Sequence, residues 1–102
     1  MVARTSTSER IAIQLHAIEC AVADLPEIVE EWDELPDGER ASLSLDWDHL
    51  MGSYLILLER YCAGGEMSEE QSRRYNALRA SLRAALPLIE RLNFYRPSIS
   101  LE

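Results

Sequence analysis

Apolar residues recur along this chain at alternating spacings of four and three residues, the pattern that lets one α-helix pack along another. Three separate series show this spacing, so the chain is predicted to be all-α with three amphipathic helices. The series are Ile11, Leu15, Ile18, Val22, Leu25, Val29 and Trp32, then Leu43, Trp47, Leu50, Tyr54, Leu57 and Tyr61, and last Tyr75, Leu78, Leu82, Ala85, Ile89 and Leu92.

Turn and capping signals separate these series. A type I turn is predicted at residues 35–38, the Gly64-Gly65 pair should end the second helix, and Arg96-Pro97 should stop the third. Ser68 and Gln71 have the spacing of a capping box, whereas Asp37 and Ser44 both qualify as N-cap of the second helix. Residues 1–102 are therefore predicted to form a single domain with helices at about 7–34, 39–63 and 68–95.

Two prolines fall inside the predicted helices. A proline has no N–H to donate and bends a helix, so kinks are expected near Pro26 and Pro87. The residues 24–27 read Asp-Leu-Pro-Glu, which also suggests a capping box that opens a second helical piece. Short loops place consecutive helices antiparallel, so the predicted architecture is an up-down-up three-helix bundle.

The first helix also has small residues away from its apolar seam. Ala17, Cys20 and Ala21 lie beside Ile13 and would let another helix approach closely. This pattern predicts a homodimer, although three helices can also close into a monomeric bundle, in which case these residues are an ordinary surface.

Charge and composition exclude several classes of function. The chain has a net charge of −8. Residues 1–50, with twelve acidic residues and three arginines, carry −9, and residues 51–102 carry +1. Such a chain repels phosphate backbones, which argues against nucleic-acid binding. Cys20 and Cys62 have no metal or disulfide spacing, and no apolar run approaches the roughly 20 residues of a membrane span. A cytoplasmic protein with no membrane contact and no cofactor is expected.

Acidic residues crowd the end of the first helix, and no arginine lies between Asp24 and Arg40. Six like-charge pairs three or four residues apart would cost about 1 to 3 kcal/mol before screening. A basic partner, bound cations or the arginines of the third helix would offset that cost, and solubility alone is the remaining explanation. The predicted partner-binding acidic face is Asp24, Glu27, Glu30, Glu31 and Glu34.

Metal binding is the alternative from a different class. His16 with Glu19, and Asp46 with His49, each place a histidine and a carboxylate three residues apart, as di-iron helical bundles do. Pairing the first two helices about the 35–38 turn would, however, separate the histidines by roughly 13 Å along the bundle. A shared ion is therefore expected only at a site between two subunits.

No nucleophile, base and orienting group can be assigned with only two histidines, and no glycine-rich phosphate loop is present. Arg10 and His16 stand six residues apart, as arginine and histidine do in some helical ribonucleases, which makes a small ribonuclease-like enzyme a third alternative. The leading prediction is a non-catalytic interaction or regulatory module that binds a basic protein surface or itself.

Overall fold

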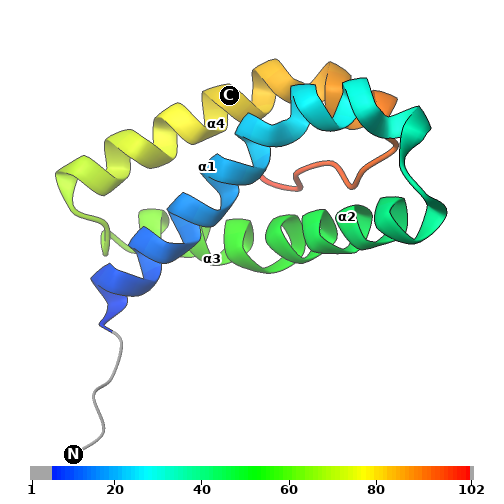
Figure 1. Cartoon of the computed structure of the whole chain (residues 1–102). Helices are drawn as coiled ribbons and strands as arrows, with labels where there is room; N and C mark the ends of the chain where they lie inside the picture. The colour runs from blue at the N-terminus through cyan, green and yellow to red at the C-terminus, as the bar shows by residue number, and fades with distance from the viewer. Residues whose placement is uncertain (1–5, 102) are drawn as a thin grey trace, which may run out of the picture.

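The computed structural model describes residues 6–101, and within that range every regular element is helical. Three helical rods follow one another up, down and up, which confirms the all-α three-helix architecture (Figure 1). The elements are α1 (Thr7–Glu31), the 3₁₀ turn η1 (Trp32–Glu34), α2 (Asp37–His49), the π-helical segment η2 (Leu50–Tyr54), α3 (Leu55–Ala63) and α4 (Glu69–Arg91).

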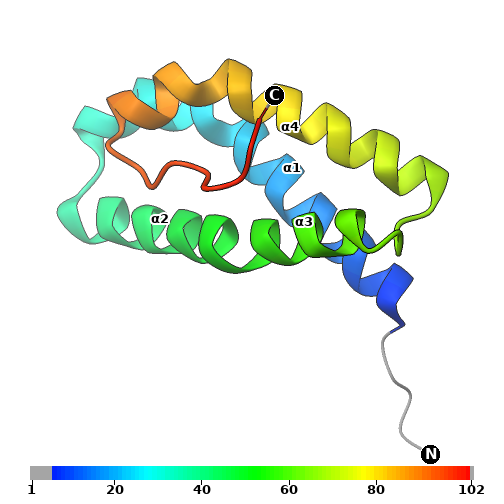
Figure 2. The same ribbon diagram turned by 180° about the vertical axis from the view of Figure 1, so that it is seen from behind.

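The first rod is one continuous helix. Ser6 caps it, since its side-chain oxygen accepts a hydrogen bond from the backbone N–H of Glu9 at 3.1 Å. Pro26 lies inside α1 and no second helix starts beside it, so the predicted capping box at residues 24–27 was wrong. Both views show α1 changing direction in its last turns, where Pro26 removes a backbone donor (Figures 1 and 2).

The second rod starts two residues earlier than predicted and is not uniform. Pro36 is the N-cap of α2 and makes no side-chain hydrogen bond there, so neither Asp37 nor Ser44 caps the helix. At η2 the backbone hydrogen bonds join residues five positions apart instead of four. The N–H of Leu55, for example, donates to the carbonyl of Leu50. The rod ends as predicted at the glycine pair, because Gly65 adopts φ of +70°, a left-handed conformation in which glycine avoids the Cβ clash.

The third rod, α4, begins at the predicted capping box. Ser68 accepts from the N–H of Gln71, and the Gln71 side chain accepts from the N–H of Ser68, each at 3.1 Å. The helix continues through Pro87 but ends at Arg91 instead of near residue 95. Asn93 adopts φ of +58°, and the next residue, Phe94, donates its N–H to the carbonyl of Ile89 at 3.0 Å. This left-handed turn, and not Pro97, stops the helix.

α1 is the central rod of the bundle. One side of it packs along α4, and another packs against η2 and α3, while α1 and α2 diverge from each other (Figure 1). The molecule is flat, with principal extents of 45 × 38 × 19 Å. The buried core consists of Ile11, Leu15, Ile18, Leu25, Trp47, Met51, Leu55, Leu58, Tyr75, Leu78, Leu82, Ala85, Ile89, Leu92 and Phe94.

The C-terminal tail, residues 92–101, turns back and runs between α4 and α2 (Figure 2). The Phe94 ring is buried, with its centroid 5.5 Å from that of Trp32 and 5.8 Å from that of Trp47. Trp47 Nε1 donates to the carbonyl of Tyr95 at 2.7 Å, and Arg79 Nε donates to that of Ser100 at 3.0 Å. Leu92 and Phe94 of the tail are therefore part of the core, and the Phe94 ring packs against both tryptophans.

Candidate functional site

The acidic face predicted from the sequence lies on the last two turns of α1 and on η1. All five of its residues are exposed: Asp24, Glu27, Glu30, Glu31 and Glu34. The ion pairs that the structure contains between residues 6 and 101 are Glu19 with Arg74 and Glu90 with Arg96, so none of them neutralises this face. Within the described residues, no arginine of α4 forms an ion pair with this face.

The basic side chain of Arg40 reaches this end of α1 and binds backbone carbonyls instead of carboxylates. Arg40 Nε donates to the carbonyl of Trp32 at 2.8 Å, and its Nη2 atom donates to the carbonyl of Asp33 at 3.0 Å. Its guanidinium lies 5.5 Å from the centre of the Trp32 ring. Arg40 therefore satisfies carbonyls at the negative end of the helix dipole, and the carboxylates of the acidic face stay unneutralised by ion pairs within the described chain.

A groove lies next to the acidic face, in the angle where α1 and α2 diverge; we call it the α1–α2 groove. It has a volume of about 270 Å³. The small residues predicted as a helix contact surface form part of one wall, and the buried rings of Trp47 and Phe94 border the cavity. Its lining is Ala17, Cys20, Ala21, Asp24 and Ile28 from α1, Leu43, Asp46, Trp47 and Leu50 from the second rod, and Phe94 from the tail.

The two histidine–carboxylate pairs proposed as metal ligands have other contacts. Glu19 Oε1 accepts from Arg74 Nη2 at 2.6 Å, and this hydrogen bond is the main cause that raises the pKa of Arg74. His16 Nε2 lies 3.6 Å from the Sγ of Cys20, the His49 ring packs edge-on against Tyr54, and Asp46 lines the groove. Within residues 6–101, no three His, Cys, Asp or Glu side chains are grouped closely enough to hold a metal ion.

The two residues of the ribonuclease-like alternative lie on the first half of α1. Arg10 and His16 are both exposed, and the contact of His16 is with Cys20. Tyr75 has the pKa that departs most from its ordinary value, and its hydroxyl donates to the partly buried carboxylate of Glu59. Burial, followed by this hydrogen bond, raises the pKa of Tyr75, which stabilises its neutral form and suits a structural role.

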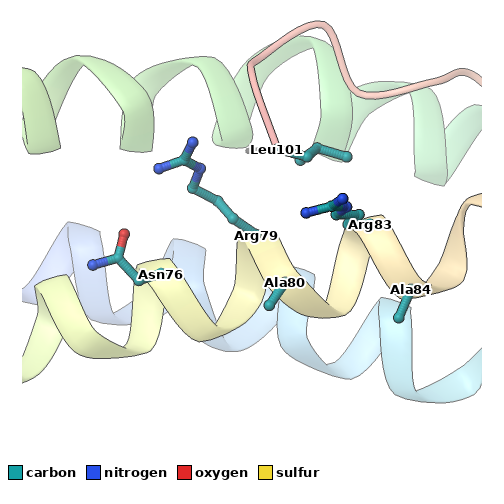
Figure 3. Close-up of a pocket in the computed structure, with 6 residues that line it drawn as sticks. All are labelled: Asn76, Arg79, Ala80, Arg83, Ala84 and Leu101. Atoms are coloured by element: carbon teal, nitrogen blue, oxygen red, sulfur yellow. The ribbon is translucent and has the colours of Figure 1, made fainter.

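A second, more basic depression lies between α4 and the end of the tail, with a volume of about 590 Å³ (Figure 3). Arg79 and Arg83 extend from α4 across it, and Leu101 lies on the opposite side. Arg79 is held by the Ser100 carbonyl and lies 5.9 Å from the centre of the Tyr75 ring. This depression follows from the packing of the tail on α4.

The sequence pattern identified the acidic residues and the small-residue wall of the groove but missed its other wall and its border at Phe94. Leu43 and Leu50 were assigned to the helix seam, and nothing in the pattern indicated that α1 and α2 diverge. Arg40 as a cap of α1 was also missed, although it is the first basic residue after the acidic run.

No helix within residues 6–101 has the length and apolarity needed to cross a membrane. Comparisons with protein-family models, with curated proteins and with solved structures found no match to this chain.

Proposed function

We propose that this protein is a non-catalytic interaction module whose acidic face binds a basic surface of a partner protein. The observation that carries the proposal is the set of five exposed carboxylates on the last two turns of α1 and on η1, without an ion pair to any described residue. A surface of this kind attracts basic groups and repels phosphate backbones.

The free energy of repulsion among these carboxylates gives the proposal its mechanism. Like charges three or four residues apart on a helix destabilise the free protein, and they do so at the negative end of the α1 dipole. A basic partner replaces repulsion by attraction, and the attraction also accelerates the first encounter. Binding should therefore weaken as salt rises, because salt screens exposed charges.

The test measures binding of a fluorescent lysine-rich peptide by anisotropy at low and at physiological salt. Replacing Glu27, Glu30, Glu31 and Glu34 together by glutamine should weaken binding by about tenfold, which corresponds to about 1.4 kcal/mol. The matched control changes the same number of charges elsewhere: Glu9→Gln, Asp48→Asn, Glu66→Gln and Glu70→Gln.

Both variants have the same net charge, so the comparison separates a local site from the overall field of the protein. Stronger binding by the control than by the acidic-face variant supports the proposal. Equal weakening in both would contradict it, because the peptide would then respond only to net charge.

A further inference from the structure

We infer that the α1–α2 groove binds one amphipathic helix of the partner protein, with apolar side chains in the groove and basic side chains along its rim. The inference rests on the proposed function and adds the kind of partner segment and its position. It comes from the shape, the lining and the charge of the groove, considered in turn below.

The shape of the groove suits a helix. The α1 residues that line it, Ala17 to Ile28, span about 16 Å, or about three helical turns. Alanine and cysteine side chains on this wall keep the α1 backbone accessible to a close approach, as small residues do at helix contacts. The volume of about 270 Å³ lies just below the usual range of small-molecule sites, roughly 300 to 1,000 Å³.

The lining of the groove supplies apolar contacts for such a helix. Leu43 and Leu50 stand one below the other on the second rod, seven residues apart, opposite Ile28 on α1. Trp47 and Phe94 are almost completely buried, with 3% and 6% exposure, so the rings at the groove are held rigidly. In helix-in-groove complexes a rigid apolar groove receives side chains at positions i, i+3, i+4 and i+7 of the bound helix. The seven residues between Leu43 and Leu50 correspond to about two helical turns.

The charge of the groove selects the partner. Asp24 lines it from α1 and Asp46 lines it from α2, and neither forms an ion pair with a described residue. The other acidic-face residues of α1 continue from Asp24 along the same helix end. A helix in the groove would thus lie between carboxylates on both sides, which favours lysine or arginine flanking its apolar stripe.

A second copy of this chain fits the groove less well. In a twofold dimer the same surface of both subunits meets, so two such grooves would bring Asp24 and Asp46 of both copies together. Like charges facing each other across an interface oppose association. The groove therefore favours a basic partner over self-association at this surface, and it says nothing about a dimer formed elsewhere.

The experiment uses two peptides of about 14 residues, or about four helical turns, with identical composition. In the first, leucines recur at three- and four-residue spacing with lysines beside them, and in the second the order is scrambled so that no apolar stripe forms. Binding of each to the whole protein is measured by anisotropy. The amphipathic peptide should bind at least about tenfold more tightly than the scrambled one.

Cysteine alkylation locates the bound peptide. Cys20 lines the groove and is exposed, whereas Cys62 lies on α3 outside the groove lining and serves as an internal reference. Saturating amphipathic peptide should slow the alkylation of Cys20 by about tenfold and leave the rate at Cys62 unchanged. In a Cys20→Ser variant the alkylation signal from the groove should disappear, which assigns that signal to Cys20.

A pair of leucine substitutions tests the shape directly. Ala17→Leu narrows the groove and should weaken the amphipathic peptide by about tenfold, whereas Ala41→Leu places the same side chain on an exposed position of α2 outside the groove lining. Circular dichroism of both variants establishes that they fold.

The outcomes separate the inference from the proposed function. If both peptides bind equally and Cys20 is not protected, the acidic face binds basic surfaces and the helix-in-groove inference is wrong. If neither peptide binds, both fail. A third outcome is slow alkylation of Cys20 relative to Cys62 in the absence of peptide, together with a dimeric mass in light scattering. That outcome would assign the groove to a second copy and overturn the inference.

Discussion

The two ends of this bundle treat polar groups in opposite ways. At the end formed by the start of α1, the start of α4 and α3, polar side chains pair across elements: Gln71 Nε2 donates to the Ser8 carbonyl, Arg74 binds Glu19, and Tyr75 binds Glu59. The exception is the Gln14 amide oxygen, which is buried without a hydrogen-bond partner in the described chain. At the other end, where α1 diverges from α2, the carboxylates of the acidic face have no ion pair with described residues.

This difference indicates which end of the bundle stabilises the fold and at which end we expect a partner to bind. We call the first of these ends the closed end and the second the open end. At the closed end Gln71 and Tyr75 are buried, so leaving their polar groups without hydrogen bonds would be costly. The open end combines unneutralised charge with an accessible apolar groove, and neither feature stabilises the isolated chain. We therefore expect substitutions at the closed end to change folding and those at the open end to change binding.

The largest effect should come from the core of the closed end. Ile18 is fully buried, so Ile18→Ala should reduce the free energy of unfolding by about 2 to 5 kcal/mol, through lost burial and the cavity that remains. Ile13→Ala is the matched control, because Ile13 is 58% exposed. This substitution should lower the free energy of unfolding by no more than about 0.5 kcal/mol. Urea denaturation measures both, and equal losses would mean that Ile13 is buried in solution by another chain.

A smaller effect is expected from the hydrogen bond between Tyr75 and Glu59. Tyr75→Phe removes a bond to a charged group and should cost about 1.5 to 3 kcal/mol near neutral pH. Because the folded state raises the pKa of Tyr75 above its ordinary value near 10, folding retains a proton that the unfolded chain releases.

The stability due to Tyr75 is therefore fully present below pH of about 10 and is lost as pH rises through the higher folded pKa. Unfolding free energies measured between neutral and alkaline pH should fall less steeply in Tyr75→Phe than in the wild type. Parallel curves would show that this tyrosine titrates alike in both states.

Substitutions at the open end should raise the free energy of unfolding instead of lowering it. Replacing Glu27, Glu30, Glu31 and Glu34 by glutamine removes like-charge pairs and should raise the unfolding free energy by about 1 kcal/mol at low salt, and by less at high salt. Thermal or urea unfolding at two salt concentrations measures this. A loss of stability would reveal internal ion pairs and break the contrast between the two ends.

The smallest effect is expected from divalent metal. Glu19 is bound by Arg74, so the His16–Glu19 pair is not free to ligate, and Zn²⁺, Mn²⁺, Fe²⁺ or Ca²⁺ should leave the melting temperature unchanged. A metal that binds the native state would raise it by mass action. A rise that disappears in His49→Ala, with a doubled mass in light scattering, would establish the alternative site between subunits.

Much of the fold follows from local patterns because local physics decides it. The 4–3 spacing of Ile11, Leu15 and Ile18 identified α1 and its buried side, and Ser68 with Gln71 identified the start of α4. Asn93 ends α4 early because asparagine adopts a left-handed turn more readily than most residues. In the sequence this preference is a weaker stop signal than the proline at position 97.

The candidate site was harder to predict because it depends on how distant elements meet. Exposure of the acidic residues follows from their charge, yet the groove requires α1 and α2 to diverge and Phe94 to return from the tail beside Trp47. The π-helical segment at residues 50–54 is likewise invisible to an apolar pattern that continues on both sides of it.

The packing of Phe94 against the two tryptophans also provides an intrinsic fluorescence probe. Trp32 and Trp47 are the only tryptophans in the chain, and both contact the Phe94 ring at the open end of the bundle. Selective excitation of indole therefore observes that end alone, whereas the far-ultraviolet dichroism of the helices observes the whole molecule. A change in emission without a change in ellipticity distinguishes occupancy of the groove from unfolding in a sample that carries no label.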